Sequence, residues 1–378
     1  MNRPPRRRDT RRLLLAAGVA AAAWLAPAGC QRQESAIPEQ LSDTAFWSLV
    51  NGLSEEGGYF HSDNFVSNEL AFQYVLPELA EATGNDVYVG VGPDQNFTYL
   101  VALRPRIAFI VDIRRQNLLQ HLMYKALIEL SSDRADFLGR LFSRSRLAPA
   151  PDDQSADALF SWLATLPRDT VLFERNLGMI GRHLKEKGMA LDAFDMASLE
   201  YVYSSFYHAG PALTYSSNVA RGFGGRGMPT YRTLMTATDQ DGVNRGYLGS
   251  EENFGILKDM QARNLIVPVV GDFAGPKALR EVGNWVRQQN ATIRTFYVSN
   301  VEQYLFQQGD AWRRFYDNVS DMPMHRDARF VRSVSNRGYR RQHPFARSAS
   351  TTSDVEEVLG MFRSGRLQSY ADIVDLSR

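Results

Sequence analysis

Short apolar runs alternate with amphipathic segments along most of this chain. Each run is bounded by glycine, proline or polar residues, as is typical of strands. The run "IAFIVDI" is apolar at nearly every position, which indicates a strand buried on both faces of a sheet. We predict strands at 87–91, 107–113, 232–238, 265–272 and 292–298, and a last strand at 329–335.

The segments between these runs have the spacing of helices. In 116–130, for example, Leu119, Leu122 and Leu127 fall on one side. Strands that alternate with helices predict an α/β fold with a mostly parallel sheet covered on both faces. Right-handed crossovers then make the sheet doubly wound. The expected helices of this part are 96–103, 116–130, 251–262, 276–289, 301–307 and 354–362.

Residues 132–229 interrupt the alternation. Their apolar positions predict helical pieces around 135–142, 156–165, 171–187 and 197–205, so we interpret this stretch as a helical insertion. Two further helices, 44–53 and 66–82, precede the first strand. The sequence therefore predicts one α/β domain at 43–378, with a polar tether at 31–42 in front of it.

The first 30 residues have the composition of an export signal. Six arginines make a basic start, and 13–28 is apolar or small throughout. A run of 16 residues is shorter than the roughly 20 that a membrane span needs, and it fits the apolar core of a signal. The stretch "TRRLLL" resembles the twin-arginine signal, with Arg11 and Arg12 as the paired arginines. Export through the general secretory route is the alternative.

The end of this signal allows two cleavage sites. "APA" at 26–28 suits an ordinary signal peptidase, whereas "PAGC" resembles a lipobox that would place a lipid anchor on Cys30. We expect an exported protein that is periplasmic or a membrane-anchored lipoprotein of an exported bacterial family. Cys30 is the only cysteine, so no disulfide forms within the chain.

Composition narrows the expected partners. The formal net charge of +1 depends on the basic signal, so the rest of the chain is slightly acidic and no nucleic-acid partner is expected. The six histidines have no metal-ligand spacing, so no metal site is expected. A small-molecule ligand, and a membrane reached through Cys30, are the remaining partners.

The candidate chemistry begins at "VYVGVGPDQNFTY". Gly90 and Gly92 end the first predicted strand, where glycine lets a ligand approach the backbone. Pro93 and Asn96 lie at the start of the next helix, whose free N–H groups would point at that ligand. Asp112 ends the second strand, where a carboxylate can accept bonds from ribose hydroxyls. We therefore predict a cofactor site at these residues.

The dinucleotide fingerprint is incomplete, because Gln95 stands where a third small residue is required. The pattern resembles the class I (Rossmann-like) S-adenosylmethionine-dependent methyltransferases. Gly90 and Gly92 match the glycines of their first motif, and Asp112 matches their ribose-binding acid. Tyr88 departs from the acidic residue that is usual before the first glycine. The resemblance covers 87–130, and over 231–310 it extends only to the order of strands and helices.

The resemblance implies further site residues. In that superfamily the residues after the fourth strand usually face the methyl-transfer centre, which implies a catalytic role for Asp272 in "GDFAGP". Asp272 as a cap of the following turn is the alternative. Asp239, after the predicted strand at 232–238, is a candidate for the adenine side or an ordinary turn residue. Ser299 and Asn300 are interpreted as a helix cap.

Three more residues are candidates for substrate contact. Asn68 and Glu69 precede the first strand, where related enzymes fold a segment over the cofactor, although helix capping also explains them. Tyr207 belongs to the aromatic run "YVYSSFYHAGPALTY", which either lines a pocket or packs in the core.

These observations leave three functions open. The first is an exported methyltransferase-like protein that binds an adenosine-containing ligand, with S-adenosylmethionine as the expected cofactor. That cofactor is made in the cytoplasm, which conflicts with export. The second is a non-catalytic, membrane-anchored binding lipoprotein on the same fold, and the third is a nucleotide-dependent oxidoreductase. Fold alone does not separate them.

The signal generates a direct prediction. Changing Arg11 and Arg12 together to lysine is expected to keep the protein in the cytoplasm, because the twin-arginine route requires the pair. Cys30→Ser is expected to move the protein from the membrane to the soluble periplasmic fraction. Cell fractionation with immunoblotting measures both, and a Cys30→Ser variant that stays in the membrane fraction would rule out the lipid anchor.

Overall fold

The computed structural model describes residue 1 and residues 35–81, 86–145, 149–216, 228–335 and 348–377. Residues 35–378 form one compact unit. The expected signal beyond its first residue, including Cys30, and the start of the tether lie outside the described residues. Ile37 and Leu41 are buried, so the described part of the expected tether packs on the domain.

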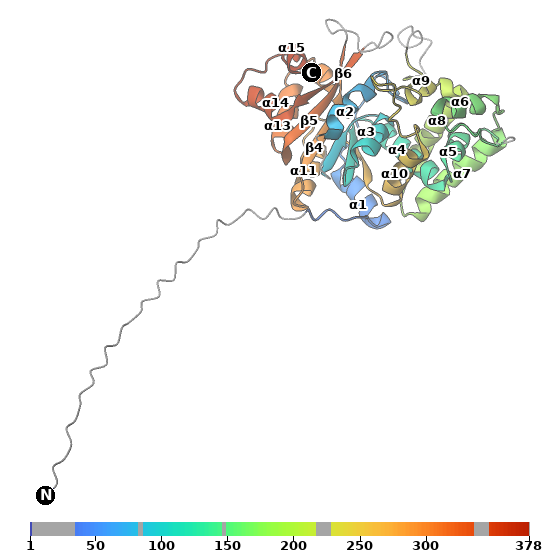
Figure 1. The fold of residues 1–378 in the computed structure, drawn as a ribbon, viewed down its shortest axis with the longest axis horizontal. Helices are drawn as coiled ribbons and strands as arrows, with labels where there is room; N and C mark the ends of the chain where they lie inside the picture. The colour runs from blue at the N-terminus through green and yellow to red at the C-terminus, as the bar shows by residue number, and fades with distance from the viewer. Residues whose placement is uncertain (2–34, 82–85, 146–148, 217–227, 336–347, 378) are drawn as a thin grey trace. The chain divides into compact units, whose positions relative to one another are not determined.

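A six-stranded sheet forms the centre of the domain (Figure 1). Its spatial order is β3-β2-β1-β4-β5-β6. All neighbouring strands are parallel except β5 and β6, which are antiparallel. The α/β class and the mostly parallel sheet are thus confirmed, and the order is compatible with a Rossmann-like arrangement. The strands are β1 (Val87–Gly90), β2 (Ile107–Asp112), β3 (Ile266–Val270), β4 (Ile293–Ser299), β5 (Met324–Ser335) and β6 (Ser348–Asp354).

Burial explains the composition of the central strands. Every residue of β1 and β2 is buried, as expected for strands covered on both faces. Pro268 is accommodated because β3 lies at the edge of the sheet and pairs only with β2. The free edge of β3 is covered by the end of α1, where Ser54 Oγ accepts a hydrogen bond from the Val270 N–H at 3.0 Å.

Helices pack around this sheet. The helix α4 is buried on nearly all sides because it contacts β2, β3 and the helical region. The helices of the α/β part are α3 (Gln95–Leu103), α4 (Arg115–Leu130), α10 (Glu251–Ala262), α11 (Ala278–Gln288), α12 (Val301–Leu305), α13 (Ala311–Ser320), α14 (Val355–Arg363) and α15 (Tyr370–Leu376).

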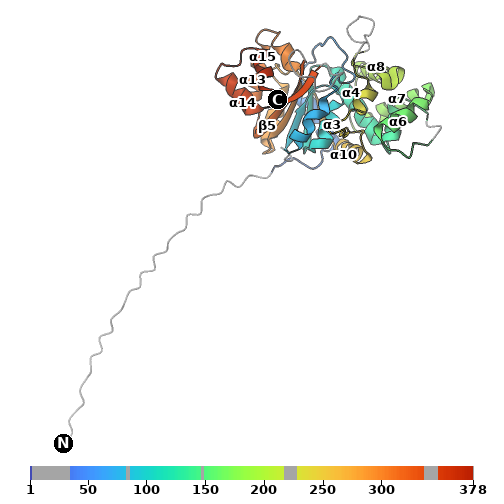
Figure 2. The ribbon, with the colours of Figure 1, turned by 45° about the horizontal axis from the view of Figure 1, so that its top comes forward.

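The stretch between α4 and α10 is helical, and its helices gather at one side of the sheet in both views (Figures 1 and 2). Aspartate or serine side chains cap the first four of these helices, such as Asp133 at α5 and Ser155 at α6. The helices are α5 (Arg134–Leu141), α6 (Ala156–Thr165), α7 (Thr170–Glu186), α8 (Ala193–Ala209), the short 3₁₀ helix η2 (Gly210–Ala212) and α9 (Tyr231–Met235).

The predicted strand at 232–238 is wrong, because α9 occupies its first half. Thr230 caps α9, since its Oγ1 accepts a hydrogen bond from the Thr233 N–H at 3.1 Å. Tyr231 anchors the helix in the core through a 2.7 Å hydrogen bond between its hydroxyl and that of Tyr247. The third strand in sequence is therefore β3, and the fourth is β4.

Residues before the sheet form α1 (Asp43–Leu53), the 3₁₀ helix η1 (Phe72–Val75) and α2 (Leu76–Glu81). The single helix expected at 66–82 is thus two short pieces that meet before Pro77. The segment 55–70 between α1 and η1 contains no regular helix or strand. Among the described residues, no helix is long and apolar enough to cross a membrane.

A buried carboxyl joins the sheet to the helical region. Asp94 precedes α3 and is only 1% exposed. Its Oδ2 accepts a hydrogen bond from the Tyr247 hydroxyl at 2.7 Å, and Tyr247 also contacts Tyr231. Burial is the largest influence on this carboxyl, and it raises the pKa of Asp94 from 3.8 to about 7.

This pKa generates a prediction about stability. The folded protein holds a proton on Asp94 that the unfolded chain releases above pH 3.8, so the burial cost grows as the pH rises from about 4 to about 7. Asp94→Asn removes this cost. Its free energy of unfolding should exceed that of the wild type by an amount that increases up to pH 7, reaching at most about 4 kcal/mol, because each pKa unit is worth about 1.4 kcal/mol.

Urea unfolding at several pH values between 4 and 8 measures this difference. Asp157→Asn is the control, because the side chain of Asp157 is 73% exposed. A difference between Asp94→Asn and wild type that stays constant over this pH range would show that Asp94 does not titrate as described.

Candidate functional site

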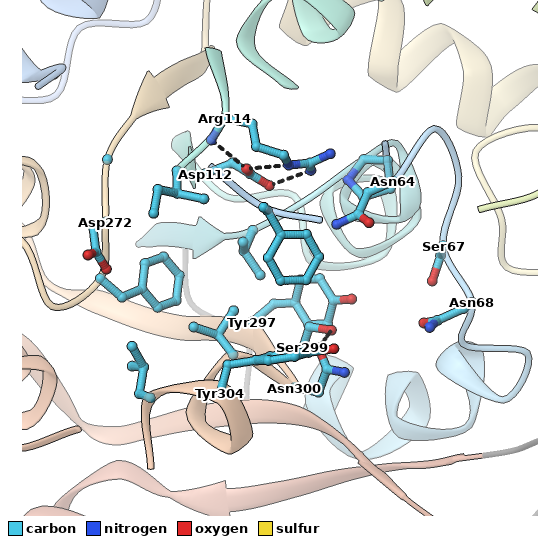
Figure 3. Close-up of a pocket in the computed structure, with 18 of the residues that line it drawn as sticks. Asn64, Ser67, Asn68, Asp112, Arg114, Asp272, Tyr297, Ser299, Asn300 and Tyr304 are labelled. Atoms are coloured by element: carbon cyan, nitrogen blue, oxygen red, sulfur yellow. Dashed lines mark hydrogen bonds and ion pairs between the residues drawn. The ribbon is translucent and has the colours of Figure 1, made fainter. Parts of the chain in front are cut away.

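A cavity of about 150 Å³ lies at the carboxyl ends of the parallel strands. Residues that follow four strands line it: Pro93 after β1, Asp112 in β2 and Arg114 after it, Asp272 after β3, and Asn300 after β4. The order of the strands reverses between β1 and β4, which is where ligands bind in open α/β sheets. The labelled side chains surround the cavity in Figure 3.

The segment before η1 closes the other side of this cavity. Phe60, Asn64, Ser67, Asn68 and Glu69 all belong to it. Asn68 and Glu69, for which the sequence left substrate contact and helix capping open, thus belong to a segment that lies at the strand ends. The structure brings Asn68, Glu69, Pro93, Asp112 and Asp272 to one cavity.

Asp112 is already paired within the protein. Its Oδ1 accepts hydrogen bonds from the Arg114 backbone N–H at 2.9 Å and from Nε at 3.0 Å, and its Oδ2 accepts from Nη2 at 2.8 Å. Both side chains are buried, at 5% and 7% exposure. The guanidinium therefore occupies the bidentate position that the hydroxyls of a ribose were expected to take (Figure 3).

Arg114 also fastens the covering segment to the sheet. Its Nη1 donates to the carbonyl oxygens of Ser62 and Asp63. One buried ion pair thus connects the end of β2 to the segment that closes the cavity. One signal for this arrangement is present in the sequence: an arginine two residues after the strand-ending aspartate.

The carbonyl oxygens of the glycine turn after β1 accept hydrogen bonds from a side chain of the protein itself. Asn96 is fully buried, and its Nδ2 donates to the carbonyl oxygens of Val91, Gly92 and Pro93 at 2.7–3.3 Å. Gly92 has φ of +80°, a conformation that favours glycine. The turn therefore presents its oxygens to Asn96.

Packing explains why a glycine occupies position 90. A Cβ atom at this position would lie 2.1 Å from Asn96 Oδ1 and 2.7 Å from the ring of Tyr88. Tyr88, which replaces the acidic residue of the methyltransferase pattern, donates its hydroxyl proton to Asn96 Oδ1 at 2.8 Å. Neither glycine lines the cavity in the described structure.

Glu69 is the centre of a buried polar network. Its Oε1 accepts hydrogen bonds from Tyr297 at 2.8 Å and Ser299 at 2.5 Å, and its Oε2 accepts from Gln95 Nε2 at 2.9 Å. The carboxyl is 98% buried, and desolvation, opposed by these hydrogen bonds, raises its pKa above the usual value. Gln95, which breaks the dinucleotide fingerprint, is thus one of the three side chains that donate to Glu69.

The residues after the fourth strand differ from those expected. Because β4 is the fourth strand, Ser299 and Asn300 hold the place that the resemblance associates with methyl transfer, and both line the cavity. Ser299 has φ of +50°, so its backbone is in the left-handed region. Asp272 follows the third strand instead, and its Oδ1 accepts from the Ala274 N–H at 2.9 Å, as the turn-capping alternative requires.

Two candidates lie apart from this cavity. Asp239 shapes the loop after α9, since its Oδ1 accepts from the N–H groups of Asp241 and Val243 at 2.9 Å and its Oδ2 pairs with Arg245. Tyr207, on α8, packs against Phe173 with ring centroids 4.8 Å apart. Neither is among the lining residues.

The part of the chain that the structure describes contains no group of three or more metal-ligating side chains. The cavity itself is lined by carboxyls, amides, hydroxyls, aromatic rings and the guanidinium of Arg114. Asn64 and Tyr304, which were not singled out in the sequence, lie among these lining residues. No short motif marks either of them.

Comparison with known proteins identifies the family. Residues 64–150 and 155–369 match a family described as a domain of unknown function, DUF7790. Because the match covers more than half of the chain, the chain belongs to this family. No curated protein matches the chain.

The buried ion pair generates a prediction about stability. Arg114→Met leaves Asp112 buried without its partner, which should lower the free energy of unfolding by about 3–5 kcal/mol. Asp112→Asn combined with Arg114→Met should cost less than the sum of the two single changes, because the double variant leaves no buried charge.

Urea unfolding measures these values, with Arg104→Met as the matched control. Arg104 pairs with Glu252 on the surface, and both side chains are more than half exposed. A surface pair is worth about 1 kcal/mol at most. If Arg114→Met costs no more than Arg104→Met, the pair does not hold the covering segment.

Proposed function

We propose that this protein binds a small organic molecule, smaller than a nucleoside, in the cavity at the strand ends, and that it does so on a methyltransferase-like fold without a nucleotide cofactor. A doubly wound sheet, export from the cytoplasm and a lipid anchor at Cys30 belong to the same proposal. The function is then that of an exported binding protein.

The single observation that carries the proposal is the pairing of Asp112 with Arg114. The carboxylate would have to exchange a bidentate guanidinium for the hydroxyls of a ribose. That exchange would leave a buried arginine unpaired, at a cost of several kcal/mol. Asn96 supports the same conclusion, because its Nδ2 already donates hydrogen bonds to carbonyl oxygens of the glycine turn.

The size of the cavity agrees with a small ligand. Its volume of about 150 Å³ is below the roughly 300–1,000 Å³ of pockets for drug-sized ligands. An apolar cavity of about 150 Å³ accommodates a molecule the size of benzene. A ligand of this class also removes the conflict between export and a cofactor made in the cytoplasm.

An adenosine-containing ligand is the second candidate. The strand order and the place of the cavity at the reversal of that order favour it, since dinucleotides and related ligands bind at such points. In that case Asp112 would have to release Arg114, and the covering segment at Ser62 and Asp63 would move with it.

Ligand-observed NMR and calorimetry of the purified protein test the two candidates. We expect several members of a library of compounds smaller than a nucleoside to bind saturably, and S-adenosylmethionine, S-adenosylhomocysteine and NAD not to bind at millimolar concentration. Asn68→Trp, which places an indole in the cavity, should abolish the binding of the small compounds.

Lys185→Trp is the control for the added indole, because Lys185 is exposed on α7. Circular dichroism checks that both variants are folded. Micromolar binding of S-adenosylmethionine would establish the second candidate instead. A library with no binder, or binders that Asn68→Trp leaves unaffected, would show that this cavity is not a ligand site.

A further inference from the structure

The charges around the cavity are unequal. Three acidic residues line it, Glu69, Asp112 and Asp272, and Arg114 is the only basic one. Arg114 pairs with Asp112, and burial favours the protonated form of Glu69, so Asp272 is the acid of the lining that neither of these effects compensates. Among the described residues, no basic side chain forms an ion pair with Asp272. An anionic ligand would be repelled here.

Asp272 is placed to receive a cation. Its side chain is half-buried, and only its Oδ1 is used by the protein, in the bond from the Ala274 N–H. Asp272 lines the cavity at the side opposite Asn64, Ser67 and Asn68 (Figure 3), and its Oδ2 accepts no hydrogen bond from the described residues. A half-buried carboxylate attracts a cation more strongly than an exposed one, because less water screens the charge.

Aromatic rings make up much of the remaining wall. Phe60 and Tyr304 meet edge to face with centroids 5.3 Å apart, and Phe273 and Tyr297 lie beside the ends of β3 and β4. The negative faces of such rings attract ammonium groups within about 6 Å. Rings together with a carboxylate are the usual surroundings of bound alkylammonium groups.

The lining also contains an amide oxygen without a hydrogen-bond partner. Asn64 Oδ1 is buried and has no hydrogen-bond partner, although Asn64 lines the cavity. A buried acceptor without a partner costs about 1–3 kcal/mol, so such groups are generally satisfied in the functional state. An N–H or O–H group of a ligand would satisfy this oxygen only if the Asn64 side chain turned toward the cavity, because the oxygen is buried.

We propose that the ligand is a small organic cation, an alkylammonium compound whose charge faces Asp272 and whose carbon atoms pack on the rings of Phe60 and Tyr304. This inference rests on the proposed function, because it names the chemical class of the ligand of that cavity. It explains why the cavity has an unbalanced acid, aromatic walls and no free basic side chain among its described residues.

Choline and its neutral isostere 3,3-dimethylbutan-1-ol provide the test, since they have nearly the same shape and differ in charge. In calorimetric titrations of the purified protein, choline should bind at least tenfold more tightly. Asp272→Asn should reduce the affinity for choline about tenfold and leave that for the alcohol unchanged. The asparagine Oδ1 still accepts the bond from Ala274, so the variant should fold. Higher ionic strength should weaken the binding of choline alone.

Glu252→Gln is the matched control, because it removes an exposed acid from α10 and should leave the ratio of the two affinities unchanged. Equal binding of choline and the alcohol to wild type, or a ratio that Asp272→Asn does not alter, would overturn the inference. If only neutral or anionic library compounds bind in the cavity, the binding function stands and its cationic ligand is wrong. If no compound of any charge binds, both proposals fail.

Discussion

The buried ion pair between Asp112 and Arg114 is the interaction on which the site depends. Asp112 is the last residue of β2, and Arg114 donates to the carbonyl oxygens of Ser62 and Asp63 in the segment that closes the cavity. A buried pair of this kind adds little net stability compared with apolar residues, yet it is costly to break. Its main effect is therefore one of position: it keeps the covering segment in one place and keeps Asp112 occupied.

The same reasoning applies to the other polar residues of the strand ends. Asn96 fills the glycine turn, and Gln95, Tyr297 and Ser299 surround Glu69. Each of these side chains satisfies a polar neighbour within the protein. The strand order is compatible with a Rossmann-like arrangement, while the polar groups at the strand ends are bonded within the protein. Asp272 and the aromatic rings of the lining are the groups that we propose for contact with a ligand.

Much of the fold could be predicted from the sequence, because apolar runs in buried parallel strands are nearly continuous. The runs at 87–91 and 107–113 became β1 and β2 for this reason. The strand predicted at 232–238 was wrong, because threonines fit both a strand and a capped helix turn. In the structure this segment begins as a helix, and Tyr231 is buried in contact with Tyr247. Because of that error, the strand before Asp272 is the fourth in the sequence-based prediction, whereas the fourth strand of the structure is β4, which ends at Ser299. Arg114 was missed although it stands two residues after Asp112, because its burial depends on distant contacts with the carbonyl oxygens of Ser62 and Asp63.

The central claim is that the protein's own side chains occupy the nucleotide contacts and that a smaller, positively charged molecule occupies the cavity. Native mass spectrometry of the protein purified gently from its own compartment tests this most directly, because a ligand retained during purification appears as an added mass. We expect the spectrum to show either the bare chain or a chain carrying an ammonium compound smaller than a nucleoside. An added mass equal to S-adenosylmethionine, S-adenosylhomocysteine or NAD would contradict it.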